Sequence, residues 1–174
     1  MKKPGDDIEN EEEKAEGPLV PDVVLPCAPS HAPNPAAVPG GKPTKIGRDD
    51  DEATARSLRR ENEAAQILAR AGYNVIQNPP KLKNGANPDY LIEGQLFDCY
   101  APATINDQTI TGTIDKKVPR QAERLVFNLA DSLLTTAEIQ AIVRGHAKDP
   151  LSGNASLKQV LVINKDESIE TIFP

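Results

Sequence analysis

Two aspartates, Asp89 and Asp98, are spaced so that their carboxylates could act together on a metal ion or a phosphate. They flank a segment in which two short apolar runs are separated by Glu93-Gly94. This spacing predicts a β-hairpin with a two-residue turn. Pairing counted outward from the turn places Asp89 directly opposite Asp98, beyond the pairs Ile92–Gln95, Leu91–Leu96 and Tyr90–Phe97.

Two directly opposed carboxylates repel each other, because their Cβ atoms lie about 5 Å apart. A cation between them would relieve that repulsion. Carboxylate oxygens suit a hard divalent cation, and we expect Mg²⁺, which keeps several waters and bridges to phosphate. The alternative is an ordinary hairpin whose aspartates are solvated at the strand ends, since two aspartates nine positions apart are a weak motif alone.

The hairpin is predicted to lie inside a sheet that is covered on both faces. Side chains alternate between the faces of a strand, so both faces of this hairpin carry apolar residues. One face has Tyr90, Ile92, Phe97 and Cys99, and the other has Leu91 and Leu96. A strand pair with two apolar faces is typical of the interior of an α/β sheet.

A helix predicted over residues 49–72 supplies a third candidate carboxylate. Acidic residues open this helix and Gly72 ends it. Glu63 lies at the edge of its apolar stripe, where it could reach a site formed with the hairpin. The alternative is a solvated Glu63 that pairs with Arg59 or Arg60. Glu61 is a second candidate on the same helix, and the sequence does not separate the two.

The remaining patterns complete a single α/β domain. Strands are predicted at 73–77, 124–129, 160–163 and 168–173, a helix over 110–117 ends before Pro119, and Thr135 with Glu138 forms a capping box before another helix. With the hairpin included, the order is α-β-β-β-α-β-α-β-β. This order predicts a mixed central sheet with helices on both faces.

Residues 1–48 differ from the rest of the chain in composition. They are acidic and then proline-rich, without aromatic residues, so they cannot bury enough apolar surface to fold alone. We predict a linker or disordered tail there, and a domain over residues 49–174. The first 52 residues hold 6 basic and 12 acidic residues, which leaves 14 of each for the remainder. The net charge of −6 therefore does not exclude a nucleic-acid substrate.

Targeting signals and cysteine usage point to a reducing place of action. No apolar run is long enough to span a bilayer, and the charged N-terminus is unlike a signal peptide. Cys27 and Cys99 are predicted to form neither a disulfide nor a metal site. We therefore expect a domain without stable membrane insertion.

The acidic residues and their elements resemble the PD-(D/E)XK nuclease superfamily, through Glu63, Pro88-Asp89 and Asp98-x-Tyr100. More narrowly, residues 56–174 resemble the tRNA-cleaving C-terminal toxin domain of contact-dependent growth inhibition proteins of the CdiA type. The segments that carry this resemblance are NPDYLIEG, FDCYAP and IDKKV. It implies a restriction-endonuclease-like αβββαβ core in which Glu63, Asp89 and Asp98 bind a divalent metal.

One departure from the superfamily pattern concerns its lysine. The pattern has a lysine two residues after the second acid, where this chain has Tyr100. In the toxin domains the lysine comes from the following helix, so the resemblance implies Lys117, with Lys116 as the alternative. Helical geometry favours Lys117, which lies about 60° from the apolar Ile114 around the helix.

The resemblance also implies a biological setting. The domain would be the C-terminal part of a larger secreted cell-surface toxin that cleaves tRNA in the cytoplasm of a target bacterial cell. A cognate immunity protein would neutralise it as a heterodimer. The alternatives are a DNA-cleaving toxin, a catalytically silent binding domain, and metal-independent attack by the RNA 2′-hydroxyl. The substrate groove is expected to be positive near Lys81, Lys83, Lys116, Lys117 and Arg120.

Overall fold

The computed structural model describes residues 25–149 and 156–174 of the chain. Within these residues a mixed seven-stranded sheet has its strands in the order β1 to β7. The strands are β1 (Gly40–Gly41), β2 (Val75–Gln77), β3 (Tyr90–Ile92), β4 (Gln95–Tyr100), β5 (Arg124–Asn128), β6 (Gln159–Ile163) and β7 (Ile169–Phe173). The helices are α1 (Glu52–Arg70), α2 (Asp107–Lys117) and α3 (Thr136–Ala147).

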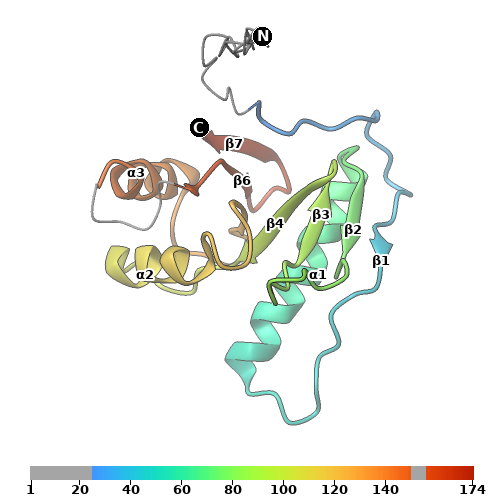
Figure 1. Ribbon diagram of the computed structural model, residues 1–174, viewed down its shortest axis with the longest axis horizontal. Helices are drawn as coiled ribbons and strands as arrows, with labels where there is room; N and C mark the ends of the chain where they lie inside the picture. Colours follow the sequence, from blue (N-terminus) through green and yellow to red (C-terminus); the bar gives the residue numbers. More distant parts are fainter. Residues whose placement is uncertain (1–24, 150–155) are drawn as a thin grey trace, which may run out of the picture.

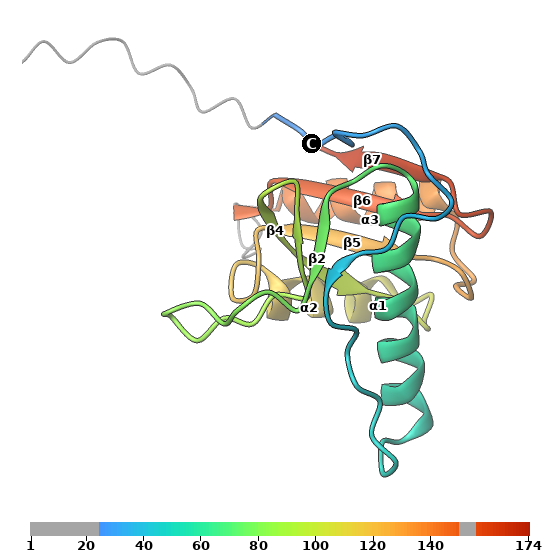
Figure 2. The ribbon, with the colours of Figure 1, turned by 90° about the vertical axis from the view of Figure 1, so that its right-hand side faces the viewer.

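Helix α1 covers one face of the sheet, and α2 and α3 cover the other (Figure 1, Figure 2). The interiors of strands β5 and β6 carry only apolar residues, because each strand contributes to both layers. Leu125 and Phe127 of β5 pack with α2 and α3, whereas Val126 packs under α1. The predicted α/β class, with helices on both faces of a mixed sheet, is confirmed.

The hairpin has the predicted register, with Tyr90 opposite Phe97, Leu91 opposite Leu96 and Ile92 opposite Gln95. Its turn residues Glu93 and Gly94 have φ values of 48° and 76°. Positive φ at both central positions gives a turn whose twist matches that of the flanking strands. Strand β4 then pairs in parallel with β5, so the hairpin lies inside the sheet rather than at its edge.

Helix α2 ends where the sequence predicts. Its last residue is Lys117, and the next residue, Val118, has an extended backbone. Proline disfavours a helical conformation in the residue before it, and Pro119 follows directly. This stop fixes Lys117 at the end of the helix that lies against the sheet.

We call residues 25–48 the N-terminal strap. They contact the folded domain, whereas their composition predicts a linker or disordered tail up to residue 48. The backbone amides of His31 and Asn34 donate to carbonyls at the end of α1, and β1 adds to the sheet beside β2. The backbone of Cys27 forms two hydrogen bonds with the buried side chain of Gln159. The strap gains its order from these long-range contacts, which its composition does not reveal. Residues 1–24 lie outside the described residues.

Two further findings concern expectations from composition. Cys27 and Cys99 are both free thiols, and Cys99 is buried. Among the described residues, none of the helices has the length and apolar character needed to cross a membrane.

Candidate functional site

Asp89 and Asp98 lie together at the open end of the hairpin. Asp89 directly precedes β3, and its Oδ2 accepts a hydrogen bond of 2.7 Å from the backbone amide of Cys99. Asp98 lies in β4 and is 2% exposed. Burial, followed by the charges of Asp98 and Glu61, raises the pKa of Asp89 to about 8. The carboxylates are therefore crowded together in a way that a bound cation would relieve.

Lys117 brings a positive charge to these carboxylates from the end of α2. Its Nζ donates to Oδ2 of Asp98 at 2.5 Å, and its side chain is 25% exposed. Burial alone would lower the pKa of Lys117, but the charges of Asp98 and Asp89 outweigh it and raise that pKa. The neighbouring Lys116 is exposed. Of the two candidate lysines, the structure thus brings Lys117 to the aspartates.

The helix carboxylate that reaches this cluster is Glu61. It is 8% exposed, and burial, opposed in part by a hydrogen bond from Thr44, raises its pKa, with a further increase from the charge of Asp98. The hydroxyl of Tyr90 donates to the backbone carbonyl of Glu61 at 2.6 Å and fixes this turn of α1 against β3. Glu61 therefore faces the sheet beside Asp98.

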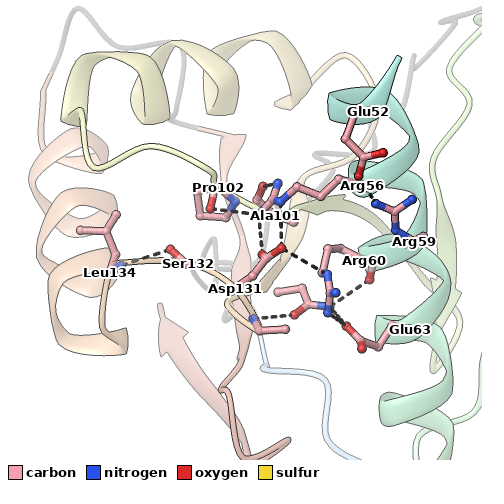
Figure 3. A network of polar contacts seen from close by, with 12 residues as sticks. Glu52, Arg56, Arg59, Arg60, Glu63, Ala101, Pro102, Asp131, Ser132 and Leu134 are labelled. Atoms are coloured by element: carbon pink, nitrogen blue, oxygen red, sulfur yellow. Dashed lines mark hydrogen bonds and ion pairs between the residues drawn. The ribbon is translucent and has the colours of Figure 1, made fainter. Parts of the chain in front are cut away.

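Glu63, the expected metal ligand, belongs to a different polar network (Figure 3). Its carboxylate accepts from Arg60 at 2.6 Å and from the buried Asn128 at 3.1 Å. In the same network, Arg56 pairs with Asp131 and donates to the carbonyl oxygen of Ala101. The structure therefore does not bring Glu63 to the aspartates, because Glu61 and Glu63, two positions apart on a helix, project about 200° apart.

The sequence does contain a signal for Glu61. The buried positions of α1 include Ala64, Ala65 and Leu68, and Glu61 precedes them by three, four and seven positions. It therefore continues the buried stripe by one turn toward the N-terminus. A carboxylate on a buried stripe is a stronger candidate than one at its edge.

Polar side chains that the sequence did not single out surround Glu61. They are Thr44 of the strap, Asn62 of α1, and Gln77 and Asn78 at the end of β2. Thr44 donates its hydroxyl to Oε1 of Glu61. No sequence pattern connects Thr44 with these later residues, because the contact depends on how the strap returns to the sheet.

The donor set fits a hard cation that takes few ligands from the protein. In the ranges 25–149 and 156–174, no three acidic, histidine or cysteine side chains are grouped so that they could enclose a metal ion. Mg²⁺ commonly binds through one or two carboxylates, and waters and phosphate oxygens complete its six positions. Burial and the charges of Asp98 and Glu61 raise the pKa of Asp89, and a cation bound beside it would favour its ionised form.

A groove of about 460 Å³ lies along the hairpin and the segment after α2. Its lining includes Leu96, which shares the Asp98 face of β4, and the basic Arg124 and Lys158. The loop between β2 and β3 forms one wall and projects from the body of the domain (Figure 2). The Asn87 amide donates to Oε1 of Gln121 at 2.8 Å and joins that loop to the opposite wall.

Basic residues stand on both sides of this junction. Lys81 and Lys83 lie on the projecting loop, Lys116 and Arg120 lie at the end of α2, and all four are exposed. The predicted positive groups therefore lie on the loop and the helix end that border the groove, although Arg124 and Lys158, which line it, were not among those predicted. Phosphate groups would be attracted to this region.

Comparisons with known proteins agree with the fold. Residues 86–169 match the family model described as the contact-dependent growth inhibition CdiA C-terminal domain. The chain is 48% identical over 145 residues to tRNA nuclease CdiA-2 of Burkholderia pseudomallei (strain 1026b), a match that covers 82% of this chain and 4% of that protein. The chain thus spans about 4% of the length of this curated relative.

A solved structure, the CdiA-CT/CdiI toxin and immunity complex from Burkholderia pseudomallei, contains a chain with the same fold. The sequences are 47% identical and the TM-score is 0.68. The match covers 79% of this chain and 100% of the solved chain.

Proposed function

This chain belongs to the CdiA C-terminal domain family of contact-dependent growth inhibition, and on that basis we propose that it is a toxin domain that cleaves tRNA. The curated relative CdiA-2 is described as a tRNA nuclease, and the similar solved chain comes from a toxin and immunity complex. The observation that carries the proposal is the convergence of Glu61, Asp89, Asp98 and Lys117. Carboxylates that can hold a divalent cation, beside an ammonium that can stabilise negative charge, suit the cleavage of a phosphodiester.

Each member of the cluster has a role that follows from its surroundings. Asp89 and Asp98 would hold a divalent cation, with Glu61 beside them, and we propose Mg²⁺. When bound, such an ion would polarise the scissile phosphate. Lys117 is partly exposed, so its ammonium can contact a phosphate oxygen while it keeps Asp98 as a neighbour. It would stabilise the negative charge that develops on the phosphate.

Retention of Lys117 favours an enzyme over a silent binding domain. A domain that only binds nucleic acid has no need of a partly buried lysine paired with a buried carboxylate, because exposed lysines bind phosphates at lower desolvation cost. Tyr100, at the position of the superfamily lysine, packs edge-on against Phe127 at a centroid distance of 5.3 Å. In this proposal Lys117 of α2 takes the part of the strand lysine, because the strand position is occupied by Tyr100, which packs against the core.

The family places this activity in competition between bacteria. We propose that the chain is the C-terminal part of a larger secreted cell-surface protein and acts in the cytoplasm of a target cell. We further propose a cognate immunity protein as its partner, as in the related toxin and immunity complex. The domain that acts there would include the strap as well as residues 49–174.

Incubation of the purified chain with total tRNA and with plasmid DNA, each with Mg²⁺ or with chelator, tests the proposal. We expect cleavage of tRNA that requires Mg²⁺ and is lost in Asp89→Asn. Asp166→Asn, in the exposed turn after β6, is the matched control and should cleave normally.

Other outcomes would identify the alternatives. Cleavage of tRNA in chelator would indicate metal-independent attack by the 2′-hydroxyl. Preferential cleavage of plasmid would indicate a DNA-cleaving toxin. Binding of tRNA without cleavage under any condition would contradict the proposed enzyme and favour a binding domain.

A further inference from the structure

The strap enters the candidate site at one residue, Thr44. Among residues 41–50, Thr44 alone is half-buried, whereas the others are exposed. Its hydroxyl donates to Oε1 of Glu61, which lies in α1 and is buried. We propose that Thr44 is a positioning residue of the nuclease site, whose hydroxyl fixes the Glu61 carboxylate beside Asp98. This inference rests on the proposed function, and it assigns a part of that function to the strap.

Thr44 is itself held in place through its backbone. The side-chain amide of Asn62 accepts from the Thr44 amide at 2.7 Å and donates to the Thr44 carbonyl at 2.9 Å. The Asn62 oxygen also accepts from Nε2 of the buried Gln77 at 2.6 Å. Paired hydrogen bonds of this kind fix the residue against α1, much as a neighbouring strand would.

The direction of the Thr44 hydroxyl is also determined. A hydroxyl has a single proton to donate and two lone pairs that accept. Nδ2 of Asn78 donates to Oγ1 of Thr44 at 2.9 Å, and the same nitrogen donates to the Lys42 carbonyl at 2.8 Å. Because Asn78 uses an acceptor position of the hydroxyl, the proton of Thr44 is directed to Glu61.

A glutamate needs such a partner if it is to act at one point. Its side chain has several rotatable bonds, and a site must hold its groups to within about 0.5 Å to be productive. Tyr90 fixes the backbone of Glu61, but its bond is to the carbonyl and leaves the side chain unrestrained. Thr44 restrains the carboxylate directly, and the side chain of Gln77 is a second, weaker partner.

Two substitutions of Thr44 separate the hydroxyl from the rest of the side chain. Thr44→Val keeps the shape and removes the hydroxyl, whereas Thr44→Ser keeps the hydroxyl and removes the methyl group. Ser30→Ala is the matched control, because it removes a strap hydroxyl that donates to Glu93 at the hairpin turn, away from the site. Glu61→Gln tests the carboxylate itself.

The measurements are single-turnover cleavage of tRNA at saturating Mg²⁺, thermal unfolding, and tRNA affinity in an Asp89→Asn background. We expect Thr44→Val to lower the cleavage rate constant by about 10- to 100-fold, as for other residues that orient a functional group. Thr44→Ser and Ser30→Ala should stay close to wild type. The tRNA affinity and the unfolding temperature of Thr44→Val should match those of the control.

Several results would overturn the inference. They are full activity in Thr44→Val, a Thr44→Ser variant as slow as Thr44→Val, or a loss of activity that follows an equal loss of tRNA affinity. An inactive Glu61→Gln beside an unimpaired Thr44→Val would overturn this inference alone. A wild-type chain that cleaves no nucleic acid would overturn the proposed function as well. If Thr44→Val does not fold, Thr44→Ala provides the same comparison with Thr44→Ser.

Discussion

Glu61 and Glu63 project to opposite sides of α1, and this difference separates a site carboxylate from a structural one. Glu61→Gln should lower single-turnover cleavage of tRNA by about 100-fold or more, because a carboxylate is lost where charge is rearranged. Glu63→Gln keeps a side chain that can accept from Arg60 and Asn128, so its cleavage rate should stay near wild type. Equal rates for the two variants would mean that Glu61 takes no part in the reaction.

Asp89 predicts a specific dependence of stability on pH. Burial and neighbouring carboxylates raise its pKa to about 8, whereas an unfolded aspartate has a pKa of about 3.9. A carboxyl with a raised folded-state pKa stabilises the fold fully below pH 4, and this contribution is lost as the pH rises through 8. Relative to Asp89→Asn, the wild-type free energy of unfolding should therefore fall by up to about 5 kcal/mol over this range.

Denaturant unfolding in the presence of chelator measures this difference, because a bound cation would mask it. Asparagine retains an oxygen that can accept from the Cys99 amide, so the variant should keep the local hydrogen bond. The gap between the two proteins should stop changing above about pH 8. A constant gap between pH 5 and pH 8.5 would show that Asp89 ionises as it does in the unfolded chain.

How well each site residue could be predicted depended on how far along the sequence its contact partners lie. Asp89 and Asp98 could be paired because a hairpin turn fixes every register position outward from it. Lys117 could be placed because Pro119 ends the helix and a 3.6-residue period determines its face. Thr44 could not be found, since its partners lie 17 and 34 positions away and no local pattern connects them.

At the level of elements, the strap differs most from what its composition predicts. It lacks aromatic residues, yet the half-buried Cys27 and Ala37 pack against the core cluster under α1. Hydrogen bonds to the ends of α1 and β2 supply the rest of its order. A segment that packs on a core formed by other elements shows no hydrophobic pattern of its own in the sequence.

The strap should therefore resist protease and hydrogen exchange in the full chain. The backbone amides of His31 and Asn34 donate at 3.0 and 2.8 Å to carbonyls at the end of α1. We expect them to exchange more slowly than the amides of Leu25 or Lys83, which form no backbone hydrogen bond among the described residues. Hydrogen exchange with mass spectrometry measures this. Rapid exchange and early cleavage between residues 27 and 44 would restore the linker interpretation.

The longer elements were predictable because each has both a start signal and a period. Helix α3 begins at the Thr135–Glu138 capping box, and α1 begins after Asp51, whose side chain accepts from the Thr54 amide. Strand β1 had no such signal, since Gly40 and Gly41 carry no side chain that could show an alternation. It forms because β2 offers an unpaired edge to a strap that already lies there.

At the scale of the whole molecule, charge is distributed unevenly around a small positive region. The exposed Lys81 and Lys83 lie beside the groove of a chain whose net charge is −6. An inhibitor that covers this region gains association rate and specificity from complementary acidic groups. We therefore expect an acidic immunity protein that competes with tRNA for the same surface.

A double variant, Lys81→Gln with Lys83→Gln, tests this in the Asp89→Asn background. It should weaken tRNA binding and reduce the slope of log affinity against log salt by up to about 2. The same substitutions should slow the association of the immunity protein at low salt. Excess tRNA should displace the inhibitor. Binding that neither tRNA nor the double variant alters would place the inhibitor on a remote surface.

The bond between Cys27 and Gln159 spans 132 positions, and it bears on how the protein is made. The core under α1 also needs Leu161 and Ile163 of β6, so the hairpin that carries Asp98 has its packing completed late in translation. Contacts between residues so far apart in the sequence form slowly, because the chain must lose conformational entropy in closing the loop before the contact can form. A partly synthesised chain that ends before β6 holds Glu61, Asp89, Asp98 and Lys117 but lacks the strand that completes the core under α1. A chain synthesised only to that point should therefore lack nuclease activity, although it holds the whole candidate cluster.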